Sequence, residues 1–124
     1  MPDLAFASAS DLIRLMERRE LTSRELLELY LSRIEKFNKG VNAVVYLDVE
    51  GARERADRAD EARSAGEIRG ALHGLPMTVK DVNNVAGWPT TYGDPREADW
   101  RPGRNRCLDR QADLAAGFVD LRDH

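Results

Sequence analysis

From residue 70 onward the chain reads Gly70-Ala71-Leu72-His73-Gly74-Leu75-Pro76-Met77-Thr78-Val79-Lys80-Asp81, and its character changes there. Glycine and proline interrupt short apolar runs, first at Met77–Val79 and again at Val82–Val85. Such punctuation favours strands and tight turns over helix. Because the residues before this segment have the periodicity of helices, the chain is predicted to be α/β in class.

Lys80 stands out in this segment. It is one of three lysines among 19 basic residues, and it lies in an apolar segment interrupted by glycine and proline rather than on a charged helix. In a strand its side chain points to the same side as Thr78 and Val82. Partial burial there disfavours the ammonium form and makes the amine a usable general base, a role that arginine cannot take. The structural alternative is a strand-end lysine paired with Asp81, and spacing alone favours that alternative.

Two amphipathic helices are predicted upstream, each opened by a capping box. The first follows Ser8-Ala9-Ser10-Asp11, and its apolar residues Leu12, Leu15 and Met16 share one face. Thr22-Ser23-Arg24-Glu25 precedes the second, with Leu21 and Leu26 placed for a hydrophobic staple. Gly40 is the expected residue beyond its end. The apolar stripe of this helix consists of Leu26, Leu27, Tyr30, Leu31, Ile34 and Phe37.

A strand and a third helix are expected next. Ala43-Val44-Val45-Tyr46-Leu47 is short, β-branched and aromatic, which is typical of a strand. Asp48 is placed to cap a helix over residues 50–65, and Gly66 to end it. The narrow apolar face of this helix consists of Ala52, Ala56, Ala59 and Ala62. Ion pairs one turn apart within the helix are expected at Arg53–Asp57 and Glu54–Arg58.

Composition excludes several classes of function. A net charge of −3 gives no basic surface for nucleic acid, and no stretch has the length and hydropathy of a membrane span. The single Cys107 excludes an intrachain disulfide and a multi-cysteine zinc site. The N-terminus has neither the basic nor the apolar run of a secretory signal. These features predict a cytoplasmic protein without membrane contact.

Other candidate residues carry less weight. His73 has only His124 as a possible companion, so a hydrogen bond that stabilises a turn is preferred to metal binding. Cys107 has no histidine near it in the sequence to activate it as a nucleophile. No metal site is predicted. Packing or loop-shaping roles are preferred for Trp88, Trp100, Thr90 and Thr91.

The segment as a whole closely resembles the start of the amidase signature family. Gly74-Leu75-Pro76-Met77-Thr78-Val79-Lys80-Asp81 matches the family pattern Gly-x-Pro-x-x-x-Lys-Asp. Gly87-Trp88-Pro89-Thr90-Thr91-Tyr92-Gly93 matches its Gly-x-x-Thr-Thr-x-Gly loop. Upstream, the stretch Leu21–Leu26 and the Ala/Asp-rich third helix are also typical of the family. The resemblance covers residues 8–93.

This resemblance implies the N-terminal part of the amidase signature fold: two helices, a strand, a helix and short strands of a mixed sheet. Family members hydrolyse or transfer carboxamides through a Ser–cis-Ser–Lys triad in which an unprotonated lysine is the ultimate base. Lys80 matches that lysine, and backbone amides of a Gly/Ser-rich loop would form the oxyanion hole. The resemblance implies a small-molecule amide substrate and no metal or organic cofactor.

The two serines of that triad have no match in this sequence. In the family they follow the lysine, in surroundings of the Gly-Ser-Ser-Gly-Gly type. The serines here are Ser8, Ser10, Ser23, Ser32 and Ser64, and all of them precede Lys80. We therefore expect the polypeptide to be inactive alone.

Residues 94–124 are predicted to be a separate tail that follows an amidase-like part at residues 1–93. The tail is rich in arginine and poorly patterned, which a truncated or frame-shifted gene explains. Two alternatives stay open. One is a fragment of a glutamine-dependent amidotransferase A-type subunit. The other is a non-catalytic module that docks on a partner, or on a second copy, through the exposed apolar faces of its first two helices.

Overall fold

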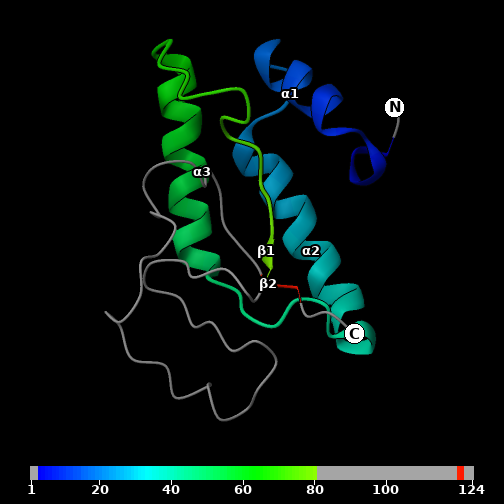
Figure 1. The fold of residues 1–124 in the computed structure, drawn as a ribbon. Coiled ribbons are helices and arrows are strands. Elements are labelled where there is room, and N and C mark those ends of the chain that lie inside the picture. The colour runs from blue at the N-terminus through cyan, green and yellow to red at the C-terminus, as the bar shows by residue number, and fades with distance from the viewer. Residues whose placement is uncertain (1–2, 81–119, 122–124) are drawn as a thin grey trace.

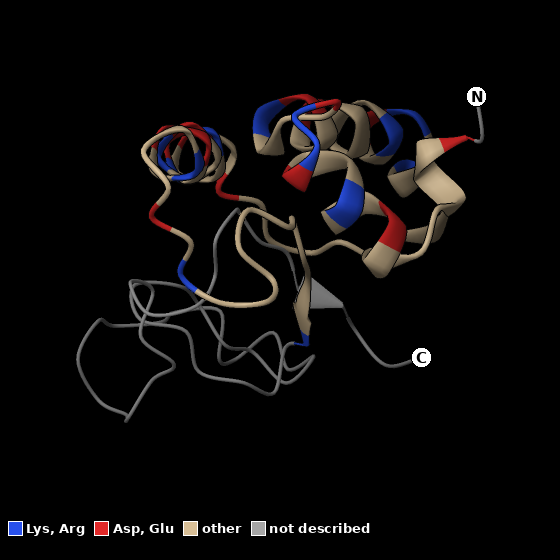
Figure 2. Ribbon diagram, turned by 90° about the horizontal axis from the view of Figure 1, so that it is seen from above, with Lys and Arg blue, Asp and Glu red and all other residues tan. Residues whose placement is uncertain are grey.

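The structure is a computed structural model, and residues 3–80 and 120–121 are described here. Its elements in chain order are the 3₁₀ turn η1 (Leu4–Phe6), the helices α1 (Ala9–Glu17), α2 (Ser23–Val41) and α3 (Val49–Ser64), and the strands β1 (Val79–Lys80) and β2 (Asp120–Leu121). α2 and α3 lie side by side and run in opposite directions (Figure 1). From the end of α3 the chain returns along one side of the helices to β1 (Figure 2). None of the described helices has the length and hydropathy needed to cross a membrane.

The first two helices begin at the capping residues that the sequence predicts, Ser8 and Thr22. Thr22 Oγ1 accepts the Glu25 amide at 3.0 Å, and the Glu25 carboxylate accepts the Thr22 amide at 2.9 Å, which completes the predicted capping box. Ser8 caps α1 by accepting the Asp11 amide at 3.1 Å. The second half of that box is wrong, because the Asp11 carboxylate accepts the Ser8 hydroxyl and pairs with Arg14 instead of the backbone.

The observed end of α3 agrees with the end predicted from the sequence, whereas the observed end of α2 does not. α3 is capped by Asp48 and closes at Gly66, whose φ is +78°, as predicted. α2 continues through Gly40 and ends at Asn42, whose φ is +51°. Asparagine tolerates this left-handed conformation, and the Asn42 amide bonds to the Asn38 carbonyl at 2.6 Å. The predicted end at Gly40 is therefore wrong.

The strand predicted over residues 43–47 is also wrong. Within the described part of the chain this segment makes one isolated bridge, at Val44. The side-chain amide of Asn38 bonds both the N–H and the C=O of Val44, at 2.9 and 2.8 Å. Three apolar residues of the segment, Val44, Tyr46 and Leu47, pack in a half-buried apolar cluster. The described residues packed in this cluster are Ile34, Val44, Tyr46, Leu47 and Val79.

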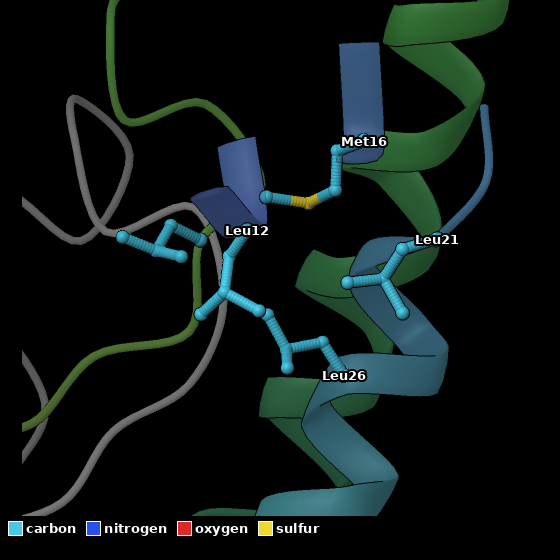
Figure 3. Close-up of a cluster of buried hydrophobic side chains, with 5 residues drawn as sticks. Leu12, Met16, Leu21 and Leu26 are labelled. Carbon is cyan, nitrogen blue, oxygen red and sulfur yellow. The ribbon is translucent and has the colours of Figure 1, made fainter. Parts of the chain in front are cut away.

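The main core lies where α1, the start of α2 and the chain after α3 meet. Side chains of α1 and α2 point toward one another there (Figure 3). Leu21 and Leu26 are both buried in this core, as the staple requires. Its buried members are Leu12, Met16, Leu21, Leu26 and Leu75. The apolar faces of the first two helices are thus largely used within the chain.

α3 packs closely on α2 because its facing residues are small. Ala52 and Ala56 are buried against Leu27, and Ala59 is buried one turn further along, which confirms the alanine face. Ala62 is only half-buried.

The charged residues of α3 reach across to α2. Arg53 donates two hydrogen bonds to the Glu28 carboxylate, from Nε at 2.7 Å and from Nη2 at 3.1 Å, and it also forms an ion pair with Glu50. Asp57 pairs with Arg24 at 2.6 Å. The predicted Arg53–Asp57 pair is wrong, because α2 offers both residues a partner that periodicity within α3 does not reveal.

Candidate active site

Lys80 is the second residue of β1, which pairs in parallel with β2. Val79 lies opposite Asp120, and Lys80 opposite Leu121. The exposure of the side chains alternates over residues 77–80: Met77 and Val79 are half-buried, whereas Thr78 and Lys80 are exposed. Lys80 therefore shares a face with Thr78, as predicted.

The partial burial expected for Lys80 is not found. Its side chain is exposed, because β2 lies along the edge of β1 and pairing of that kind covers neither face. Val82 and Asp81, the predicted face-mate and the alternative partner of Lys80, lie outside the described residues.

Hydrogen bonds of His73 attach the segment that precedes β1 to helix α3. Its side chain is buried, with Nε2 2.8 Å from the Ala59 carbonyl oxygen. Nδ1 accepts the Arg69 amide at 3.2 Å, so the hydrogen bonds assign the ring proton to Nε2, which donates to Ala59. Arg63 Nη2 donates to the His73 carbonyl at 2.7 Å. The turn-stabilising role predicted for His73 is confirmed.

Gly74 and Ser23 form a close contact beside His73. Gly74 has a φ of +80°, and a Cβ on it would overlap Ser23 Oγ. Ser23 is fully buried, and its Oγ lies 3.8 Å from Met16 Sδ. This serine packs the start of α2 and is not presented to a substrate.

The pronounced pKa shifts belong to the contacts between α2 and α3. Hydrogen bonds from Arg53, aided by Arg24, lower the pKa of Glu28 from 4.5 to about 2 against the opposing effect of burial. The same bonds to Glu28 raise the pKa of Arg53, and bonds to Glu28 and Asp57 raise that of Arg24. These groups hold two helices together and form no catalytic pair.

Several residues singled out from the sequence cannot be placed in this site. They lie outside residues 3–80 and 120–121: Trp88, Thr90, Thr91, Trp100, Cys107 and His124. The described ranges contain no cluster of three or more side chains suited to hold a metal ion. Sequence reasoning did not identify the contacts of Ser23 and Ala59 with residues 73–74. The glycine that directly follows His73 was the available signal in the sequence.

Comparison with known proteins defines the class of this α/β segment. A family model described as Amidase matches residues 25–105. The A-type subunit of the Glutamyl-tRNA(Gln) amidotransferase of Salinispora tropica is 40% identical over 121 residues, which is 98% of this chain and 24% of that protein. The Acylamidase of Rhodococcus erythropolis is 34% identical over 97 residues, or 78% of this chain and 20% of the relative.

Solved structures agree with these relatives. Native peptide amidase from Stenotrophomonas maltophilia superposes with a TM-score of 0.67 at 35% identity, over 72% of this chain and 19% of that enzyme. A structure described as PAM12A gives a TM-score of 0.76 at 32% identity, over 95% and 24% of the two chains. The chain belongs to the amidase family, and its fold is a fragment of the family's α/β fold. It spans 24% of the length of the first of these curated relatives.

The boundary predicted between residues 93 and 94 lies inside the family match, which continues to residue 105. It also lies outside the described residues. The separate character of residues 94–124 stays a prediction.

Proposed function

We propose that this chain supplies the general base of an amide-cleaving site, and that Lys80 is that base. The observation that carries the proposal is the Gly74–Asp81 motif, which lies within an amidase-family match and contains Lys80, an exposed residue of β1. The Lys80 amine would accept the proton that the bridging serine relays from the nucleophilic serine. The nucleophilic serine would then add to the carboxamide carbon. The proton taken up by Lys80 would return through the bridging serine to the leaving nitrogen as the C–N bond breaks, which leaves an acyl-enzyme and a neutral amine or ammonia.

A chimera tests the role of Lys80 directly. Residues 8–93 of this chain would replace the aligned segment of the Stenotrophomonas maltophilia peptide amidase, which supplies the rest of an amidase domain. We expect amide hydrolysis by the chimera to fall by about 10³-fold or more with Lys80→Ala and with Lys80→Arg, because neither side chain can act as the base. Lys39→Ala, on exposed α2 surface, is the matched control. Undiminished activity of the Lys80→Ala chimera would disprove the assignment.

By itself, the 124-residue polypeptide is proposed to lack triad-dependent activity, since none of its serines matches a triad position. We expect the wild-type polypeptide and its Lys80→Ala variant to give the same background rate with a simple acyl anilide. Hydrolysis by the wild type that Lys80→Ala abolishes would show that a nucleophile of this chain reaches Lys80.

The substrate is proposed to be a small carboxamide, and the site to work in the cytoplasm. The amidotransferase branch is the second candidate, favoured because the match to the Salinispora tropica amidotransferase protein covers 98% of this chain at 40% identity. Co-purification of the chain with the other subunits of that amidotransferase would support this branch. Failure to bind them, with an active chimera, would favour the amidase branch.

Self-association is a further proposal, and two exposed aromatic rings, one on η1 and one on α2, support it. Phe6 and Phe37 are 77% and 50% exposed. The Arg33 guanidinium lies 5.1 and 5.3 Å from their ring centroids. A dimer through these rings would be weakened by Phe6→Ser with Phe37→Ser. Sedimentation that shows a monomer for the wild type at all concentrations would exclude the dimer.

A further inference from the structure

Three consecutive residues, His73, Gly74 and Leu75, hold the chain that leads to Lys80; we call them the clasp. The His73 ring bonds to the Ala59 carbonyl and the Arg69 amide, and Arg63 holds its carbonyl. The backbone of Gly74 lies against Ser23, where a Cβ would overlap the Ser23 hydroxyl. Leu75 is buried in the main core. The clasp therefore joins this chain to α3, to the start of α2 and to the core at once.

Only a short extended stretch separates the clasp from Lys80. Lys80 follows Leu75 by five residues, about 16 Å of extended chain. Pro76 comes first in this stretch, and its ring restricts the backbone that leaves the clasp. At the far end Val79 joins the half-buried apolar cluster with Ile34, Val44, Tyr46 and Leu47. The chain is thus fixed on both sides of residues 76–78.

The register of this stretch decides where Lys80 points. Side chains alternate along a strand, so a shift of one residue would turn Lys80 toward the apolar cluster and Val79 away from it. The β1–β2 ladder is two residues long, and so short a ladder specifies register weakly. The clasp is the fixed point from which the alternation is counted.

We propose that His73 is a positioning residue for Lys80, because the clasp that it anchors sets the register of the strand carrying that lysine. The catalytic consequence rests on the proposed role of Lys80 as a base. The register of the strand does not depend on that role, and it can be measured in the 124-residue chain without any enzymatic activity.

The experiment follows methyl groups by NMR in the whole chain. His73→Phe keeps a ring of similar size and removes both ring hydrogen bonds. His73→Gln places an amide donor near the position of Nε2 and should keep the bond to Ala59. Leu27→Ala, in the contact between α2 and α3, is the matched control for general loss of stability. The readouts are the contacts of the Val79 methyls with the half-buried apolar cluster and those of Ala56 with α2.

We expect His73→Phe to lose the Val79 contacts while Ala56 keeps its contacts with α2, and His73→Gln to restore the Val79 contacts. Leu27→Ala should have the opposite effect, weakening the contacts of Ala56 and sparing those of Val79. Unchanged Val79 contacts in His73→Phe would overturn the proposal. Loss of both sets of contacts in His73→Phe and in His73→Gln would also overturn it, since His73 would then support the fold in general.

A second measurement connects register to chemistry. In the active chimera, His73→Phe should lower kcat by about tenfold or more with little change in KM, and His73→Gln should recover most of it. Unchanged kcat with a changed register would separate register from catalysis and overturn the positioning role. Lys80→Ala tests the base independently, so the two proposals can fail separately.

Discussion

A left-handed backbone suits glycine better than other residues, yet α1 closes on an arginine. Arg19 has a φ of +59°, and its amide bonds to the Met16 carbonyl at 3.1 Å. Arg19→Gly removes the steric cost of a Cβ in this conformation and should raise the free energy of unfolding by about 1 kcal/mol. Urea unfolding monitored by far-UV circular dichroism measures this change in the free energy of unfolding.

Its neighbour is the control for this prediction. Arg18 has a φ of −79° in the helical region, so Arg18→Gly should lower stability by about 0.5–1 kcal/mol. Equal effects of the two substitutions would show that the left-handed conformation does not limit stability at this turn.

Gly74 and Gly66 share nearly the same backbone conformation, with φ of +80° and +78°, but not the same surroundings. A Cβ on Gly74 overlaps the buried Ser23 hydroxyl, whereas a Cβ on Gly66 meets open space. Gly74→Ala should therefore destabilise the chain by about 2–4 kcal/mol, from backbone strain plus overpacking. Gly66→Ala should cost about 1–2 kcal/mol, from strain alone. Thermal unfolding of both variants tests the difference; equal losses would mean that Ser23 moves aside without cost.

At the scale of elements, α3 caps the start of α2. The Asp60 carboxylate accepts the amides of Ser23 and Arg24 at 2.8 and 3.0 Å, while Thr22 takes the amide of Glu25. The first three amide donors of α2 are thus satisfied, two of them by a neighbouring helix. A negative charge there also suits the positive end of the helix dipole.

Asp60→Ala should lower the free energy of unfolding by about 1–2 kcal/mol, because two helix-terminal donors lose a charged acceptor. Asp60→Asn, which keeps one acceptor oxygen, should lose less. Exposed Glu61→Ala is the control and should stay within about 0.5 kcal/mol of wild type. Denaturant unfolding at neutral pH measures these changes in the free energy of unfolding. An Asp60→Ala variant as stable as Glu61→Ala would contradict the capping role.

These elements show what a sequence can and cannot predict. The Thr22–Glu25 capping box, the alanine face of α3 and its end at Gly66 depend on residues within one turn of each other, and all three were predicted. The Asp60 cap, the Arg53–Glu28 pair and the missing strand at 43–47 depend on partners in other elements, which local pattern does not identify.

The same division holds for the candidate site. Strand alternation predicted the face that Lys80 shares with Thr78, because alternation is local. The role of Lys80, which the Gly-x-Pro-x-x-x-Lys-Asp motif suggests, stays a prediction. The clasp was not foreseen as a unit, since His73 bonds a carbonyl on α3 and Gly74 meets a serine on α2. Exposure of Lys80 was missed because burial of a strand face depends on what lies over it.

At the scale of the molecule, α2 and α3 are held by a small alanine contact supplemented by charges. Glu28 is the centre of these charges, bonded by Arg53 at 2.7 Å and Arg24 at 2.8 Å. Its side chain is 39% exposed, so solvent screens the network and its contribution is modest. A modest contribution still matters in a chain of this size, where the core is small.

The acid stability of the molecule should therefore depend on Glu28. Its pKa falls from 4.5 to about 2 on folding, so the unfolded chain binds more protons between those pH values and stability decreases as pH falls through that window. Above it the carboxylate contributes fully, and Glu28→Gln should cost about 1 kcal/mol or less at pH 7 after allowance for screening. The difference between wild type and Glu28→Gln should shrink as pH is lowered from about 4.5 toward 2, while Glu61→Gln follows wild type. Urea unfolding at pH 7, 4 and 3 measures this, and a constant difference between wild type and Glu28→Gln across that series would show that the α2–α3 contact does not depend on the Glu28 charge.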